Sequence, residues 1–306
     1  MIQALFDGVL EGAIVSLGAV GLTLVMHILR FANFSHAELL SIGAYVALVF
    51  DALFGAVSPA LVAAFAPTTV TAALALSALL AVALTGASAV AVDRLAFRRL
   101  RARAGPLTMV FASFGVALIL RNLIALVFGL QTVRYDDAIA FAVMVSADPF
   151  LLVKPDQVAV LAVALAAMAA LHLTLTRSPL GHALAAVAEN PALAQVNGVN
   201  LGRMVAVVWL IGGGLAALAG VAYGLTQHLS PVMGRDLVLA LFAAAIVGGL
   251  GSAPGAVLGG FAVGLASSLS LLALPAGYKP AIPFLLILAV LAVRPQGLFG
   301  DAGGAR

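Results

Sequence analysis

The sequence contains no cysteine and few charged residues. Of its 306 residues, 9% are charged and 64% are hydrophobic. The lack of cysteine excludes a disulfide framework, a thiolate zinc site and a cysteine nucleophile. A soluble domain carries about 25% charged residues, so a soluble form of this chain would have to cover itself with apolar groups. Lipid is the simplest solvent for it, and the net charge of only +3 gives no reason to expect a nucleic-acid partner.

Motifs of catalysis and nucleotide binding are also missing. The chain has no G-x-x-x-x-G-K-[ST] sequence, and therefore no loop to cradle the phosphates of ATP. It has no G-x-S-x-G or H-E-x-x-H, and its apolar segments hold few carboxylates. An intramembrane enzyme would need a paired nucleophile and base, and a proton pump a relay of carboxylates. We expect a non-enzymatic protein that moves a solute with energy taken from another chain.

Long apolar segments fill most of the chain. A helix that crosses the hydrocarbon needs about 20 residues, and shorter ones are tolerated where protein surrounds them. Candidate segments lie at about 8–29, 36–54, 69–92, 107–128, 157–176, 201–225, 237–250, 257–274 and 280–293. The pattern predicts an all-α polytopic membrane protein with about 8–10 transmembrane helices, some short or broken, and about nine crossings. Residues 1–306 form a single transmembrane domain.

Arginines in the short loops predict the orientation, because such loops carry their positive charge on the cytoplasmic side. Five lie between the third and fourth segments, namely Arg94, Arg98, Arg99, Arg101 and Arg103. This places the loop at 177–200 and the C-terminus, with Arg306, in the cytoplasm, and the N-terminus outside. The 129–156 loop then lies outside, which suits its acidic residues Asp136, Asp137, Asp148 and Asp156. A re-entrant segment around 139–152 would change the count of crossings.

A polar stretch separates the first two apolar segments. Ser35 and Glu38 have the spacing of a capping box, in which the hydroxyl accepts from the amide of residue 38 and the carboxylate from that of Ser35. The alternative is functional: Asn33, His36 and Glu38 line the inner end of a pathway, since polar groups at membrane depth usually face a cavity. A single histidine without further ligands predicts no metal site.

The 177–200 loop has the pattern of two short helices. Leu180, Leu184 and Val187 recur at helical spacing, which indicates one amphipathic helix. Asn190 suits an N-cap, Pro191 the first helical position and Gly198 a C-terminal cap, so we expect a second helix at about 191–197. Asn200 can then cap the next membrane segment. The loop is either an ordinary ordered connection or a ledge that fits a groove of a cytoplasmic partner.

Further candidate features lie inside the apolar segments. Arg121 is costly there unless it is paired, and we expect it to reach the outer interface, with contact to a polar or anionic substrate group as the alternative. Glycine pairs four residues apart, including Gly8 with Gly12 and Gly260 with Gly264, let helices approach closely. They indicate tight packing within the chain, or an interface or moving gate near Gly248 and Gly249.

Four stretches, in this order, give the chain a resemblance to the permease subunits of branched-chain amino acid ABC importers. They are Gly21–Tyr45, with Leu29-Arg30-Phe31-Ala32-Asn33-Phe34-Ser35-His36 at their centre, Pro179–Asn200, Ala245–Ala256 and Arg294–Gly300. The resemblance covers nearly the whole chain. It implies an ABC importer permease fold in a bacterial-type inner membrane. Ser267 and Ser268 depart from the family pattern, where an acidic residue is common, and Ala185 replaces a usual arginine.

The resemblance also implies partners. A second, homologous permease subunit would complete the pathway, two cytoplasmic ATPase subunits would bind ATP and Mg²⁺, and an external binding protein would deliver the substrate. This chain would need no cofactor. Its ATPase-coupling residues would be Glu189, Asn190, Pro191, Ala192 and Gly198. The substrate would be a branched-chain or other small amino acid, with urea or short amides as family alternatives. A stand-alone secondary transporter or channel for a small polar solute is the competing hypothesis.

Overall fold

The computed structural model describes residues 1–101, 103–135, 141–147 and 150–300. Its helices are α1 (Ile2–Leu29), α2 (His36–Val57), α3 (Ala72–Val92), α4 (Arg98–Arg101), α5 (Pro106–Phe128), α6 (Pro155–Arg177), α7 (Pro179–Glu189), α8 (Pro191–Val196), α9 (Leu201–Thr226), α10 (Met233–Gly248), α11 (Ala253–Ser270) and α12 (Ile282–Val293). Short 3₁₀ turns cover Pro59–Val62 and Ala276–Ala281, and a π-helical turn, Asp93–Phe97, joins α3 to α4. The predicted all-α membrane class is confirmed.

Within the described residues, eight helical segments are long and apolar enough to cross a membrane. They are Ile2–Leu29, His36–Val57, Ala72–Arg101, Pro106–Phe128, Pro155–Arg177, Leu201–Thr226, Ala253–Ser270 and Ala276–Val293. The segment predicted at 237–250 is α10, a helix of only 16 residues. It is packed among α1, α2, α11 and α12, where a helix too short to span the hydrocarbon is still shielded from lipid.

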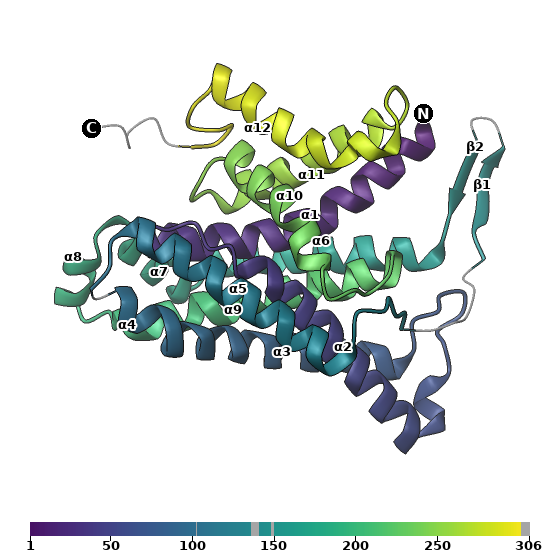
Figure 1. Ribbon diagram of the computed structural model, residues 1–306, viewed down its shortest axis with the longest axis horizontal. Coiled ribbons are helices and arrows are strands. Elements are labelled where there is room, and N and C mark those ends of the chain that lie inside the picture. Colours follow the sequence, from purple (N-terminus) through teal and green to yellow (C-terminus); the bar gives the residue numbers. More distant parts are fainter. Residues whose placement is uncertain (102, 136–140, 148–149, 301–306) are drawn as a thin grey trace.

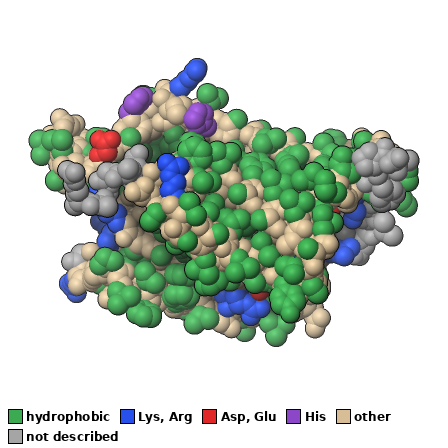
Figure 2. All heavy atoms as spheres, turned by 90° about the horizontal axis from the view of Figure 1, so that it is seen from above, with side chains coloured by type: hydrophobic (Ala, Val, Ile, Leu, Met, Phe, Trp, Pro, Cys, Tyr) green, Lys and Arg blue, Asp and Glu red, His purple; other side chains and the backbone are tan. Residues whose placement is uncertain are grey.

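The bundle is built around α1 and α9, whose most apolar windows are each 72% buried. Helices α2, α3, α10 and α11 surround them, whereas α5, α6 and α12 lie at the periphery (Figure 1). Apolar side chains cover most of the face drawn in Figure 2. This is the arrangement expected of a chain whose outer surface meets lipid instead of water.

Small residues bring α1 and α11 together. A Cβ atom added at Gly12 would lie 2.7 Å from the Cα of Phe261, and one at Gly8 would lie 2.9 Å from the Cα of Leu265. Gly260 and Gly264 on α11 are equally close to the backbone of α1. The pairs predicted from their spacing of four therefore pack within this chain.

The loop between α5 and α6 contains a feature that the sequence analysis did not predict. Strands β1 (Val143–Ala147) and β2 (Phe150–Val153) pair antiparallel where a re-entrant segment was considered. Nearby, Tyr135 donates a hydrogen bond to the carbonyl of Ala44 (2.9 Å), and burial raises the pKa of its phenol. Asp136, Asp137, Asp148 and Arg306, whose charges helped to predict the orientation, lie outside the described residues.

Candidate functional site

The 177–200 loop folds as two capped helices, which we call the α7–α8 ledge (residues 179–196). The Ser178 hydroxyl accepts from the amide of Gly181 (3.1 Å) at the start of α7. Asn190 Oδ1 accepts from the amide of Leu193 (3.0 Å) at the start of α8. The stripe predicted for α7 is confirmed, since Leu184 and Val187 are buried. The predicted second helix is present, and it ends at Val196.

Gly198 closes α8 in the way its position predicts. Its φ of +85° lies in the left-handed region that favours glycine, and its amide donates to the carbonyl of Gln195 (2.9 Å). Val199 donates to the carbonyl of Ala194 (3.0 Å), and Asn200 Oδ1 then accepts from the amide of Arg203 (3.0 Å) to begin α9. Both caps predicted around this turn are confirmed.

The ledge projects from one end of the bundle (Figure 1), and two of its apolar side chains are exposed. Leu193 is 59% exposed and Val196 is 86% exposed. Of the predicted coupling residues, Glu189, Asn190, Ala192 and Gly198 are exposed, and Pro191 is partly buried. Arg30, at the end of α1, donates to the carbonyl of Ala188 (3.1 Å) and ties the ledge to the central helix.

The start of α2 lies inside the bundle, and its capping differs from the prediction. Ser35 donates from its amide (3.2 Å) and its hydroxyl (2.7 Å) to Asn33 Oδ1. The hydroxyl therefore turns away from the amide of Glu38, which donates to the Ser35 carbonyl (3.2 Å). The predicted capping box is wrong, because the Ser35 hydroxyl bonds to Asn33 and the Glu38 carboxylate bonds to Arg121.

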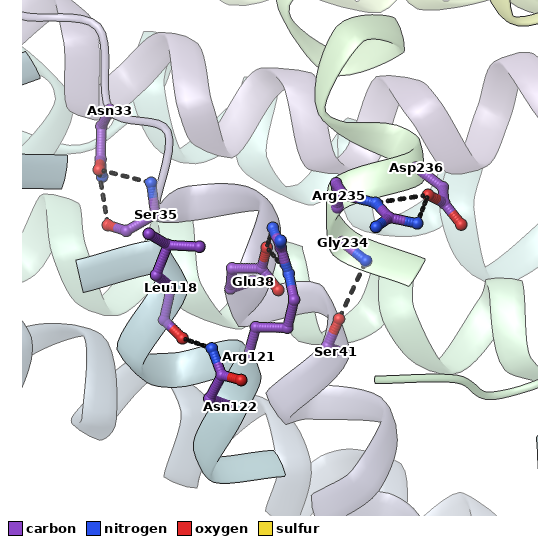
Figure 3. A network of polar contacts seen from close by, with 10 residues as sticks. All are labelled: Asn33, Ser35, Glu38, Ser41, Leu118, Arg121, Asn122, Gly234, Arg235 and Asp236. Atoms are coloured by element: carbon purple, nitrogen blue, oxygen red, sulfur yellow. Dashed lines mark hydrogen bonds and ion pairs between the residues drawn. The ribbon is translucent and has the colours of Figure 1, made fainter. Parts of the chain in front are cut away.

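Arg121 extends from α5 to Glu38 on α2 (Figure 3). Its Nε lies 3.1 Å from Oε1 of Glu38, and its Nη2 forms an ion pair with the same oxygen. The side chain of Glu38 is 1% exposed and that of Arg121 20% exposed. The expectation that Arg121 reaches the outer interface is wrong, because a carboxylate within the protein offers a charge-assisted partner at less cost than an unpaired charge.

The candidate pathway residues at this point are all buried. Asn33 and His36 are 0% exposed, and the His36 ring lies against Gly21 of α1 and Gly212 of α9. Gly21 is more than two turns before the end of α1, so the polar stretch lies within the bundle rather than at its inner end. A helix start at this depth is a site where polar groups can meet a solute. Their role in a pathway stays a prediction.

Gly248 and Gly249 end α10 in a closely packed junction. Gly248 abuts the backbone of Gly255, and Gly249 has a φ of +106° beside Phe299 and the segment that ends the described chain. Leu298 donates to the carbonyl of Val247 (2.8 Å) and Phe299 to that of Gly248 (3.0 Å). The C-terminal stretch thus satisfies carbonyls at the end of α10. Whether either glycine lines a pathway stays a prediction.

A cleft that the sequence analysis did not predict lies toward the opposite end of the bundle from the ledge. It has a volume of about 460 Å³ and is bordered by α1, α9, α10, α11 and the turn before α12. Glu11 and Lys279 form an ion pair across it at 2.7 Å. Asp7 and Asp236 add carboxylates, and leucines and prolines supply apolar walls. One feature of the sequence could have indicated this cleft: Asp7 and Glu11 are two carboxylates one helical turn apart in an apolar segment.

Within the residues that the structure describes, no group of three or more histidine, aspartate or glutamate side chains could hold a metal ion. His36, the buried histidine of the polar stretch, has apolar helices around it.

Comparison with known proteins decides the family. Residues 4–291 match the family model described as the permease component of the branched-chain amino acid transport system. The chain belongs to this family. It is a multi-pass transport component of a membrane system, and not an enzyme.

Curated relatives of this permease component cover nearly its whole length. It is 30% identical to the high-affinity branched-chain amino acid transport system permease protein LivH of Escherichia coli, over 98% of this chain and 95% of LivH. It is equally similar to BraD, the permease protein of the same description from Pseudomonas aeruginosa, with the same coverage. A probable LivH from Methanocaldococcus jannaschii is 34% identical over 42% of this chain and 44% of its own. No solved structure matches the chain significantly.

Proposed function

We propose that this chain is the translocation subunit of an ATP-driven ABC importer for branched-chain or other small amino acids. The observation that carries the proposal is the α7–α8 ledge. Two capped helices hold Leu193 and Val196 in exposed positions at the end of the bundle. Both side chains lie outside the eight apolar membrane segments, so contact with lipid does not account for their exposure, whereas a partner that covers them would. The ledge fits a groove of a cytoplasmic ATPase.

In this proposal, other chains supply the energy. The sequence has no loop for ATP phosphates, so two ATPase subunits would bind ATP and Mg²⁺. A second, homologous permease subunit would complete the pathway, and an external binding protein would deliver the substrate. Residues 1–306 then act as one transmembrane permease domain, with the coupling loop at 177–200 in the cytoplasm and the N-terminus outside.

The cleft opposite the ledge supports an amino acid as substrate. A zwitterion with an apolar side chain needs a carboxylate for its ammonium group, a cation for its carboxylate and an apolar wall. Glu11, Asp7 and Lys279 supply the charges, and Leu10, Ile14 and Leu237 part of the wall. Urea or a short amide would not require the paired charges. From this cleft the solute would pass the buried groups at Asn33, His36 and Glu38, and the α10 end at Gly248 and Gly249.

Reconstitution tests the energy source. The permease pair with its ATPases and binding protein is placed in liposomes, and uptake of labelled leucine is followed. We expect uptake only when ATP and the ATPases are both present. Unchanged uptake by the purified chain without them would support a stand-alone transporter or channel and would overturn the proposal. Uptake that requires ATP but prefers urea or a short amide to leucine would overturn the substrate alone.

Gly198 offers a sharper test of the ledge. Proline cannot adopt a φ of +85° and has no amide to donate to Gln195, so Gly198→Pro should unwind the end of α8. Gly198→Asn should preserve it, because asparagine tolerates this backbone region and keeps its amide. We expect Gly198→Pro to abolish co-purification of the ATPases, and Gly198→Asn to retain it. Normal co-purification with Gly198→Pro would remove the ledge from the docking surface.

A further inference from the structure

A second cleft, which no part of the proposed function uses, lies at the ledge end of the bundle. It has a volume of about 720 Å³ and separates the end of α3 from the start of α9. Four arginines line it: Arg94, Arg98 and Arg101 from one wall, and Arg203 from the other. We call it the arginine cleft. Residues about 100 positions apart in the sequence thus direct positive charge to one space.

The cleft carries a clear excess of positive charge. Its lining includes one carboxylate, that of Asp93, and Arg101 forms an ion pair with it. Among the described residues, Arg94, Arg98 and Arg203 have no carboxylate within ion-pair distance. One carboxylate against four guanidinium groups leaves three positive charges, which favours an anion with several oxygen atoms.

The two walls of the arginine cleft are held in place by aromatic packing below it. Phe97, in the π-helical turn, stacks on Trp209 of α9 with ring centroids 5.5 Å apart. Both side chains are 0% exposed. The turn that carries Arg94, and that leads directly into Arg98 of α4, is therefore fixed against the helix that carries Arg203. The backbone of both walls is therefore held by the core of the protein, and the cleft is part of the fold.

Its location points to a lipid. The cleft lies where the apolar segment Ala72–Arg101 ends and Leu201–Thr226 begins. The ends of helices that cross a membrane fall at the level of the lipid headgroups. Leu95 lies between Arg94 and Arg98 in sequence and is 75% exposed, and Val90, Val205 and Ala206 line the cleft. Apolar groups beside guanidinium groups match a phosphate with attached acyl chains, whereas free phosphate or an acidic protein segment would not need them.

We propose that the arginine cleft binds the phosphate group of an anionic glycerophospholipid, with the acyl chains against α3 and α9. Gln195 of α8 also lines the cleft, so a bound headgroup would lie beside the ledge. The site is thus placed to stabilise the ledge from the membrane side. It is independent of which solute the chain transports.

The test compares two double variants of equal charge change. Arg94→Gln with Arg203→Gln removes one cleft arginine from each wall, and Arg99→Gln with Arg103→Gln removes two exposed arginines that do not line the cleft. The purified chain is loaded in nanodiscs of phosphatidylcholine with phosphatidylglycerol, and retained lipid is counted by native mass spectrometry. An arginine beside an anionic headgroup favours its binding roughly fivefold, and in the proposed site only the cleft arginines lie beside it, so the cleft variant should retain phosphatidylglycerol on the order of 25-fold less tightly. The control variant should match the parent chain.

Further arms separate the other ligands. Inorganic phosphate alone should not raise the melting temperature of the parent chain, whereas phosphatidylglycerol should. Equal stabilisation by inorganic phosphate would overturn the lipid assignment, as would a cleft variant that loses only ATPase binding and keeps its lipid. If the cleft variant does not fold, a photo-crosslinkable phosphatidylglycerol on the parent chain decides. Crosslinks should map to 90–98 and 200–206, and crosslinks confined to other segments would refute the site.

Discussion

A buried ion pair connects the peripheral helix α5 to the interior of the bundle. Glu38 is almost fully buried, so its charge has lost its water and depends on Arg121 for compensation. Only 17% of the most apolar window of α5 is buried within the chain. Beyond the ion pair, the hydroxyl of Ser113 accepts from the amide of Phe34 (3.1 Å), and Phe34 stacks on Phe114. The pair is therefore a main attachment of α5 to α2.

Removing one partner of this pair should cost far more than removing both. We expect Arg121→Met to lower the free energy of unfolding by about 3–5 kcal/mol, because it leaves the Glu38 charge uncompensated. Adding Glu38→Gln should restore much of that loss, which equilibrium unfolding of the purified chain in detergent would measure. As a control, Arg235→Met disrupts the exposed pair with Asp236 and should change stability by about 1 kcal/mol or less. If the double variant lost as much free energy of unfolding as the two single variants together, this account would be contradicted.

The sequence predicted polar residues correctly where their partners lie nearby in the chain. Asn190 and Asn200 each cap an amide three residues onward, so spacing alone identifies the bond. Ser35 and Glu38 have an equally good local spacing, yet Glu38 bonds a residue 83 positions away. A motif states which local bond is feasible. It contains no information on a competing partner brought in by another helix.

Close backbone contact is the main device that joins the central helices. Gly12 and Gly264 let α1 and α11 touch along their length, so dispersion contacts replace the hydrophobic driving force that lipid does not supply. α10 uses the same device, with Gly248 against Gly255 of α11. Such a junction has no room for an added methyl group. Close backbone contact therefore both stabilises the junction and makes it sensitive to substitution.

This packing makes one glycine costly to replace and another harmless. Gly12→Ala would place a Cβ atom 2.7 Å from the Cα of Phe261, so the helices must separate, at a cost of about 1–3 kcal/mol. Gly115→Ala in α5 meets nothing within 4 Å and should stabilise the isolated chain by up to about 1 kcal/mol through helix propensity. Thermal unfolding of both variants measures the difference. Equal melting temperatures would show that α1 and α11 do not depend on this contact.

At the scale of elements, the lengths of the apolar segments predicted the helices but did not predict the structure of the connections between them. The short helix α10 was expected because its apolar run is too short to span the hydrocarbon. The hairpin of β1 and β2 was not expected, since its strands of five and four residues give little periodicity. The cleft of Glu11 and Lys279 was also missed, because its walls come from both ends of the chain. Its existence depends on helix packing, which no local pattern records.

The whole molecule has two chemically different ends. The α7–α8 ledge lies at one end (Figure 1), and the arginine cleft lies beside it, since Gln195 of α8 lines that cleft. The cleft of Glu11 and Lys279 is lined by the first half of α1 and the turn before α12, toward the other end. The start of α1 and the end of α12 also lie at opposite ends in that view. The import proposed for this chain needs such polarity, because an importer receives the solute on one side and energy on the other.

The polarity predicts which side of the membrane each end faces. The absence of cysteine allows single reporter thiols without background labelling. Gly277 and Ala192 are exposed positions at opposite ends. Because positive loops stay inside, we expect Gly277→Cys to react with a membrane-impermeant maleimide in intact cells, and Ala192→Cys only after permeabilisation. Labelling of the permeabilised cells is the control for reactivity. Labelling of Ala192→Cys in intact cells would place the ledge outside, where it could not reach a cytoplasmic ATPase, and would overturn both the orientation and the coupling role.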